Sequence, residues 1–252
     1  MRELHAAEIT EAVARLCIQA NTRLSSDAEA ALRDACAREP WPGAKGILSD
    51  LCANLDLARE TGLPICQDTG IVTVFAELGQ DVHITGGDFE SAVQEGVRRG
   101  YAEGYLRKSV VSDPLRRVNT GDNTPAAVCV RIVPGEHVKL TVSPKGAGSE
   151  NMCRVKMLTP AMGEAGVREF VLDTVRAAGG NPCPPIVVGV GIGGGFDSVA
   201  ALARRALLRP LDSANGDEFY AAMERELLAA IDATGIGPQG LGGATTALAV
   251  LV

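Results

Sequence analysis

The sequence has few aromatic residues, few histidines and no run of basic residues. Phe, Trp and Tyr make up 4% of its 252 residues, so we expect a core built mainly from Ala, Val, Leu and Ile. The net charge is -7 and no basic segment is present to neutralise a phosphate backbone, so we expect no nucleic-acid partner. His5, His83 and His137 do not combine with acidic residues or cysteines at zinc-ligand spacing, which argues against a zinc hydrolase.

Long apolar segments are lacking as well. No run approaches the roughly 20 apolar residues of a membrane span, and the N-terminus MRELHAAEIT is polar rather than signal-like. We therefore expect a cytoplasmic protein without a membrane partner. The seven cysteines are odd in number and irregular in spacing, unlike a secreted disulfide framework, so each is interpreted as a small core residue or a metal ligand.

Familiar nucleotide and hydrolase motifs are absent or incomplete. The sequence has no nucleophile-elbow serine and no Gly-x-x-x-x-Gly-Lys-Ser/Thr loop. Residues 189–194 do fit G-x-G-x-x-G, but the second strand with an acidic end roughly 20 residues later is missing. We interpret these glycines as allowing tight packing of a strand on a helix, with Asp197 as the N-cap of that helix. A nucleotide-binding oxidoreductase is the less favoured alternative, testable by NAD binding.

Hydrophobic periodicity predicts a mixed α/β fold, with a helical N-terminal layer packed on an α/β body that contains a mixed sheet. No linker or repeat divides the chain, so we expect one domain over 1–252. Helical patterns occupy the first 62 residues, including 25–38 and 44–61, and later 88–107, 163–178, 197–208 and 216–234. Strand patterns occupy 71–78, 127–133, 137–142, 185–190 and 245–252. The turn Pro134-Gly135-Glu136 predicts a hairpin between the second and third of these strands.

Four polar loops lie beside the predicted strands, where functional residues are commonly carried. They cover residues 64–70, 119–125, 145–151 and 181–185. Cys66 and Cys183 lie in two of these loops, where a thiolate is accessible to iron. Cys153 directly follows a glycine-containing loop, and its role is left open. The remaining cysteines lie in apolar helix or strand patterns and are interpreted as core residues: Cys17, Cys36, Cys52 and Cys129.

Two further loop residues have both a functional and a structural interpretation. Asp68 could act as a general base if it is partly desolvated near a cationic metal site. Alternatively, Asp68-Thr69-Gly70 is only a turn in which Asp accepts a backbone hydrogen bond, and these residues judged alone favour the turn. Lys145 and the amides of residues 146–149 could cradle a carboxylate, or they could form a plain glycine loop.

Five segments, in this order over nearly the whole chain, resemble the α subunit of two-component class I fumarate hydratase and L(+)-tartrate dehydratase: ICQDTG, NTGDNTPA, PKGAGSENM, NPCPPIVVGVGIGGGFD and GIGPQGLGG. The resemblance implies a [4Fe-4S] cluster held by three cysteines, with one iron acting on the substrate as a Lewis acid. Cys66 and Cys183 match two of these ligands. The third family cysteine lies downstream of Gly-Pro-Gln-Gly in a stretch that this chain lacks, and Cys153 occupies no matching position. We therefore expect a natural chain that is longer at its C-terminus.

The resemblance also implies roles for other residues. Asp68 takes part in proton transfer, Gln67 lines the substrate pocket, and Arg107 grips a substrate carboxylate. Gly148 offers a backbone amide and Lys145 a supporting charge. A β subunit would complete the site in an αβ hetero-oligomer, so the chain alone is expected to be inactive.

The substrate is expected to be a small dicarboxylate. The NTGDNTP and GSEN loops favour reversible hydration of fumarate to malate, as in the tricarboxylic acid cycle, over dehydration of L(+)-tartrate. The missing third cysteine leaves a catalytically inactive scaffold or regulatory subunit as an alternative. A cysteine encoded just past Val252, followed by a β-subunit frame, would favour the enzyme.

Overall fold

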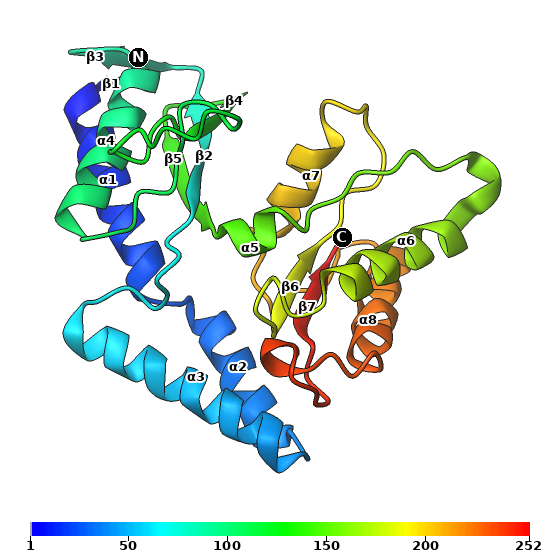
Figure 1. Ribbon diagram of the computed structural model, residues 1–252. Helices are drawn as coiled ribbons and strands as arrows, with labels where there is room; N and C mark the ends of the chain where they lie inside the picture. Colours follow the sequence, from blue (N-terminus) through cyan, green and yellow to red (C-terminus); the bar gives the residue numbers. More distant parts are fainter. Residues whose placement is uncertain (1) are drawn as a thin grey trace. The chain divides into compact units, whose positions relative to one another are not determined.

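The computed structural model describes residues 2–252, which divide into two compact units (Figure 1). The first unit comprises residues up to 24 and 55–147, and the second comprises 25–54 and 148–252. Both helices and mixed β-pairing are present, so the predicted mixed α/β fold is confirmed. One catalytic domain over 1–252 stays a prediction. None of the helices in the described part of the chain is long and apolar enough to cross a membrane.

The first unit is a three-stranded sheet covered by two helices, with a small two-stranded sheet beside them. In the larger sheet β2 is central, with β4 parallel to it on one side and β5 antiparallel to it on the other. In the small sheet β1 and β3 are parallel. The elements are β1 (Arg2–His5), α1 (Ala6–Thr22), β2 (Ile71–Gly79), β3 (Val82–Thr85), α4 (Phe89–Glu103), β4 (Ala127–Val133) and β5 (Val138–Lys145).

The predicted hairpin between β4 and β5 is wrong, because β2 lies between these two strands. The connection from β4 to β5 instead crosses the end of β2, where the Gly79 N–H donates to the His137 carbonyl over 2.9 Å. A Cβ at Gly79 would collide with the carbonyl oxygens of Gly135 and His137, so this crossing needs glycine. A short turn between two apolar runs looks the same in sequence whether the strands pair or flank a third strand.

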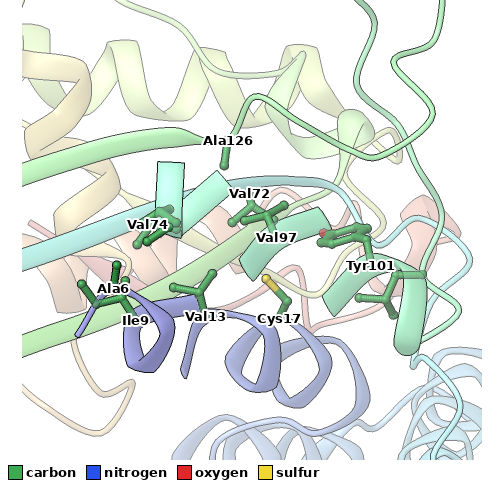
Figure 2. Packing of buried hydrophobic residues seen from close by; sticks show 12 residues of the cluster. Ala6, Ile9, Val13, Cys17, Val72, Val74, Val97, Tyr101 and Ala126 are labelled. Atoms are coloured by element: carbon green, nitrogen blue, oxygen red, sulfur yellow. The ribbon is translucent and has the colours of Figure 1, made fainter. Parts of the chain in front are cut away.

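The core of the first unit lies between α1, α4 and the sheet. Figure 2 shows Val13 and Cys17 of α1 pointing toward Val72 of β2 and Val97 of α4. All four are fully buried, and burial of each apolar side chain of this size contributes roughly 1.5–3 kcal/mol. The core therefore joins the N-terminal helix to the central strand.

Glycines let α1 and α4, side by side in Figure 1, approach closely. A Cβ on Gly96 would lie 2.7 Å from the Thr10 carbonyl oxygen, and one on Gly100 would lie 2.7 Å from that of Ala14. The Thr10 hydroxyl also donates to the Ala92 carbonyl over 2.9 Å. The four-residue spacing places both glycines on the same face of α4.

The second unit contains a parallel strand pair with helices packed around it. β6 and β7 are parallel, and side chains from α6 and α8 join theirs in one apolar cluster. The elements are α2 (Ser26–Arg38), α3 (Pro42–Thr61, whose residues from 55 on belong to the first unit), α5 (Ala147–Glu150, which begins at the last residue of the first unit), α6 (Gly163–Ala178), β6 (Ile186–Gly189), α7 (Val199–Ala206), α8 (Glu218–Asp232) and β7 (Ala247–Leu251).

Glycines at the end of β6 and directly after it pack the strand against a helix, as interpreted from the sequence. A Cβ on Gly191 would lie 2.6 Å from the Val199 carbonyl oxygen, and one on Gly189 would lie 2.5 Å from that of Ala203 in α7. The prediction that Asp197 caps this helix is wrong, because α7 begins at Val199 with Ser198 at the N-cap. The Ser198 hydroxyl is instead bonded to the N–H of Gly195 over 2.9 Å.

The close approach of α1 and α4 gives a stability prediction. Gly100→Ala should lower the free energy of unfolding by about 1–3 kcal/mol, because the added Cβ overpacks the contact with Ala14 and Cys17. Gly46→Ala in α3 is the matched control, since a Cβ there meets nothing within 4 Å. That change should raise stability by about 0.5–1 kcal/mol through helix propensity. Urea unfolding of both variants measures the difference, and a stabilising Gly100→Ala would contradict the packing argument.

Candidate functional site

The loop that carries Cys66 and Asp68 joins α3 to β2 and is a tight turn. The N–H of Asp68 donates to Cys66 Sγ over 3.4 Å, and the N–H of Gly70 donates to Asp68 Oδ1 over 3.2 Å. Gly70 has a φ of 74°, which glycine adopts without strain. Cys66 and Gln67 are exposed, and their Sγ and Oε1 lie 3.6 Å apart. The Cys66 thiol is therefore accessible and held by its own turn.

Asp68 also connects this turn to the loop after β5. Its Oδ2 accepts a 2.8 Å hydrogen bond from the N–H of Ala147, and Gly146 packs so closely that a Cβ there would lie 3.1 Å from Oδ2. The turn interpretation of Asp68 is thus correct. It does not exclude the functional one, because each carboxylate oxygen has a second lone pair to accept a proton.

A small cavity brings these residues together. It has a volume of about 140 Å³ and is lined by Cys66, Asp68, Thr69, Pro144 and Gly146, together with Ala20, Asn21, Leu24 and Ile65. Lys145 and Gln67 neighbour lining residues in sequence but do not line it.

Asn123 ties the Arg107 segment to the Asp68 turn. Its side chain is completely buried, and its Oδ1 accepts hydrogen bonds from the N–H groups of Ser109 (2.7 Å) and Val110 (3.2 Å). Its Nδ2 donates to the Gly70 carbonyl over 3.1 Å. The Asn123 amide therefore provides hydrogen-bond partners for backbone groups of both loops. The Arg107 side chain is exposed.

Two more hydrogen bonds hold the same loops. The buried Tyr101 hydroxyl donates to the Thr69 carbonyl over 2.6 Å, and the Thr69 hydroxyl donates to the Arg107 carbonyl over 3.1 Å. Sequence reasoning missed Asn123 and Tyr101 as positioning residues. The available signal was Asn123 itself, since Asn tolerates the left-handed backbone of turns in glycine-containing loops, and its φ is indeed 63°.

The second unit carries the Cys183 loop. Cys183 is exposed and has a φ of 57°, a left-handed conformation that is uncommon outside glycine. Gly148, at the start of this unit, packs against the loop so closely that a Cβ would lie 2.6 Å from the Asn181 carbonyl oxygen. Cys153 is also exposed, with its Sγ 3.9 Å from Glu150 Oε2.

Comparison with known proteins identifies the family. The family model of fumarate hydratase (fumerase) matches residues 10–252. The chain belongs to the fumarate hydratase family. It is 40% identical to the putative L(+)-tartrate dehydratase subunit alpha of Methanocaldococcus jannaschii, over 97% of this chain and 88% of that protein. It is also 32% identical to the L(+)-tartrate dehydratase subunit alpha of Escherichia coli (strain UTI89), over 96% of this chain and 81% of that protein.

The cysteines of this fumarate hydratase family member fall into distinct environments. Cys66, Cys183 and Cys153 are exposed, whereas Cys17 and Cys52 are buried. Burial raises the pKa of the Cys17 thiol to about 12, which opposes the thiolate form that binds metals. Cys36 and Cys129, predicted as core residues, are only half-buried.

Cys66 and Cys183 fit the thiolate chemistry of an iron–sulfur ligand, because both are accessible and lie in constrained turns. Within residues 2–252, no three His, Cys, Asp or Glu side chains are gathered in a way that could hold a metal ion. Cys66 belongs to the first unit and Cys183 to the second.

Asp122, next to Asn123, is held as a carboxylate. Its Oδ1 accepts hydrogen bonds from the Thr124 N–H (3.0 Å) and hydroxyl (2.8 Å), and its Oδ2 accepts one from Arg98 Nε (3.0 Å). Desolvation raises the pKa of Asp122, but the bonds from Thr124 and Arg98 outweigh it and lower the pKa to about 2.

This shift predicts a pH dependence of stability. The folded-state pKa of Asp122 lies below the unfolded value of about 4, so its stabilisation is present above pH 4 and is lost as the pH falls toward 2. Asp122→Asn should therefore be less stable at pH 7 and lose less stability between pH 4 and pH 2. Urea unfolding at several pH values tests this, with the exposed Asp81→Asn as the charge control. Equal pH slopes for the wild type and Asp122→Asn would contradict it.

Proposed function

We propose that this chain is the α-type subunit of an iron–sulfur hydro-lyase that adds water reversibly to a four-carbon dicarboxylate. The observation that carries the proposal is the cavity lined by both Cys66 and Asp68, which places a metal-binding type of side chain beside a candidate base. Membership of the fumarate hydratase family supports the reaction class. Fumarate and malate are one substrate pair, and L(+)-tartrate is the other candidate because the relatives bear that name.

The proposed chemistry divides the work between the cofactor and the chain. Cys66 and Cys183 would hold a [4Fe-4S] cluster, which would supply a Lewis-acidic iron for the substrate hydroxyl. Asp68 holds or accepts the proton at the carbon next to a carboxylate. The N–H groups of Gly70 and Ala147 fix the orientation of this carboxylate, so proton transfer needs no search among side-chain rotamers.

The remaining predicted residues would bind the dicarboxylate. Arg107 offers a planar pair of N–H donors that suits a carboxylate, and its backbone is fixed through Thr69. We propose that Gly148 donates its amide, that Lys145 adds a positive charge and that Gln67 borders the pocket beside Cys66. Arg107 and Gln67 are exposed in the isolated chain.

We propose that a β subunit supplies the rest of the site in an αβ assembly. The names of the relatives as alpha subunits support this. The test is turnover of fumarate, malate and L(+)-tartrate by the anaerobically reconstituted complex, with each subunit alone as the control. Turnover by the complex but by neither separate subunit would support the proposal. The compound with the highest kcat/KM would then identify the preferred substrate. If none of the three compounds is turned over by a cluster-loaded complex, the alternative of a scaffold or regulatory subunit is favoured.

The first prediction of this proposal concerns the metal ligands. Cys66→Ser and Cys183→Ser should each abolish the visible absorption of the reconstituted cluster and lower iron and sulfide content severalfold, because a Ser hydroxyl is a poor substitute for a thiolate. Cys153→Ser is the matched control, since Cys153 is also exposed and should retain the cluster. A Cys66→Ser chain with normal iron content would show that the ligand assignment is wrong.

The second prediction separates proton transfer from turn formation at Asp68. Asp68→Asn removes the basic oxygen, so turnover should fall by about 10² or more. Because the amide can accept from only one of Gly70 and Ala147, the free energy of unfolding should also fall by about 1–2 kcal/mol. The control is Asp113→Asn, which keeps the turn bond to Leu115 and should leave turnover unchanged. Near-normal turnover by Asp68→Asn would show that Asp68 only stabilises the turn and takes no part in proton transfer.

A further inference from the structure

The GIGPQGLGG segment lies against the Cys183 loop within the second unit. It forms the connection between α8 and β7 and includes the short 3-10 helix η2 (Pro238–Gly240). Gln239 there donates its backbone N–H to the Pro184 carbonyl over 2.7 Å. Its side-chain Nε2 donates to the same carbonyl over 3.0 Å and lies 3.4 Å from the Cys183 carbonyl oxygen. One residue therefore directs its backbone and side-chain donors at two successive carbonyls of the Cys183 loop.

Both residues in this contact have a left-handed backbone. The φ angle is 57° at Cys183 and 55° at Gln239, and such a conformation costs a residue with a Cβ roughly 1–2 kcal/mol. The backbone alone would favour glycine at position 239. The backbone conformation therefore does not account for a glutamine at this position, and its side-chain contacts need a separate explanation.

The Gln239 loop is itself anchored. Glu39 is 3% exposed, and its carboxylate accepts hydrogen bonds from the N–H groups of Ala244 and Thr245 and from the Thr245 hydroxyl, at 2.9–3.2 Å. The Gly237 N–H donates to the Thr246 hydroxyl over 3.1 Å. These bonds fix the loop on both sides of Gln239, so that Gln239 presents its donors from a constrained support.

Gly180 closes the contact from the other side. A Cβ on Gly180 would lie 3.1 Å from the Gln239 carbonyl oxygen and 3.4 Å from the Gly240 Cα. The Cys183 N–H donates to the Gly180 carbonyl over 3.0 Å. The Cys183 turn is therefore constrained both by its own hydrogen bond and by packing against the Gln239 loop. The cysteine itself remains exposed.

We propose that Gln239 is a positioning residue for Cys183, holding its turn in the conformation that presents the thiol for iron. The role of Gln239 toward iron rests on the proposed function, whereas its stabilisation of the Cys183 turn does not. Gln239 contacts the carbonyls and not the thiol, so it acts on the ligand by fixing the backbone.

Two substitutions separate the side chain from the backbone. Gln239→Gly relieves the left-handed conformation and keeps the backbone N–H, but it removes the Nε2 donor. Gln239→Glu keeps the size but directs a carboxylate at two carbonyl oxygens. Gln80→Glu is the matched control, because Gln80 is exposed and lies in the first unit.

The first measurement is hydrogen exchange of the reduced, metal-free full chain. In peptides covering 179–186, both Gln239 variants should exchange about tenfold faster than the wild type, as expected for the loss of about one hydrogen bond. Exchange in β7 should not change. The second measurement is iron release from the reconstituted complex to a chelator, which should also accelerate about tenfold in both variants and stay unchanged in Gln80→Glu.

Two results would overturn the proposal, and a third would overturn the proposed function on which its role toward iron rests. Wild-type exchange in Gln239→Gly would mean that residue 239 only fills a left-handed turn. Faster exchange with unchanged iron release would mean that Gln239 supports the fold and has no effect on the ligand. If the wild-type complex takes up no iron, the proposed function fails and with it the role toward iron, and the exchange data alone then decide whether Gln239 holds the turn.

Discussion

The loops of this protein depend on buried side chains that satisfy their main-chain hydrogen bonds. A loop packed against a core leaves N–H and C=O groups away from water, and each group without a partner costs roughly 1–3 kcal/mol. Asn123 and Tyr101 meet this demand for the turns that carry Asp68 and Arg107. Glu39 does the same for the loop that carries Gln239.

Asp68 shows that structural and catalytic interpretations of one residue are compatible. Its carboxylate accepts bonds from its own turn and from Ala147 across the loop after β5. Such bonds fix the side chain in one orientation beside Cys66, and a fixed acceptor is what efficient proton transfer requires. The same bonds mean that a substitution at Asp68 should affect stability, so a test of its proposed role in proton transfer must measure stability together with turnover.

Much of the secondary structure could be predicted because its signals are local. The predicted helices at 25–38 and 163–178 agree closely with α2 and α6, and the strand at 127–133 coincides with β4. Short elements without a periodic pattern were missed, such as β1 and β3 with four residues each. Three of the four candidate loops were predicted from their turn residues, whereas most of the predicted loop 145–151 is the short helix α5. The side chains that hold the loops were not predicted.

The sequence by itself determined the mixed α/β class, the family and the exposed turns at Cys66 and Cys183, because periodicity, turn residues and motif order can be read along the chain. Only the tertiary structure decided that β2 separates β4 from β5 and that Asn123 bonds Gly70, 53 residues away. Strand order and long-range hydrogen bonds depend on which surfaces pack together in three dimensions. A glycine such as Gly79 permits a close backbone contact, but the sequence alone does not show which segment makes that contact.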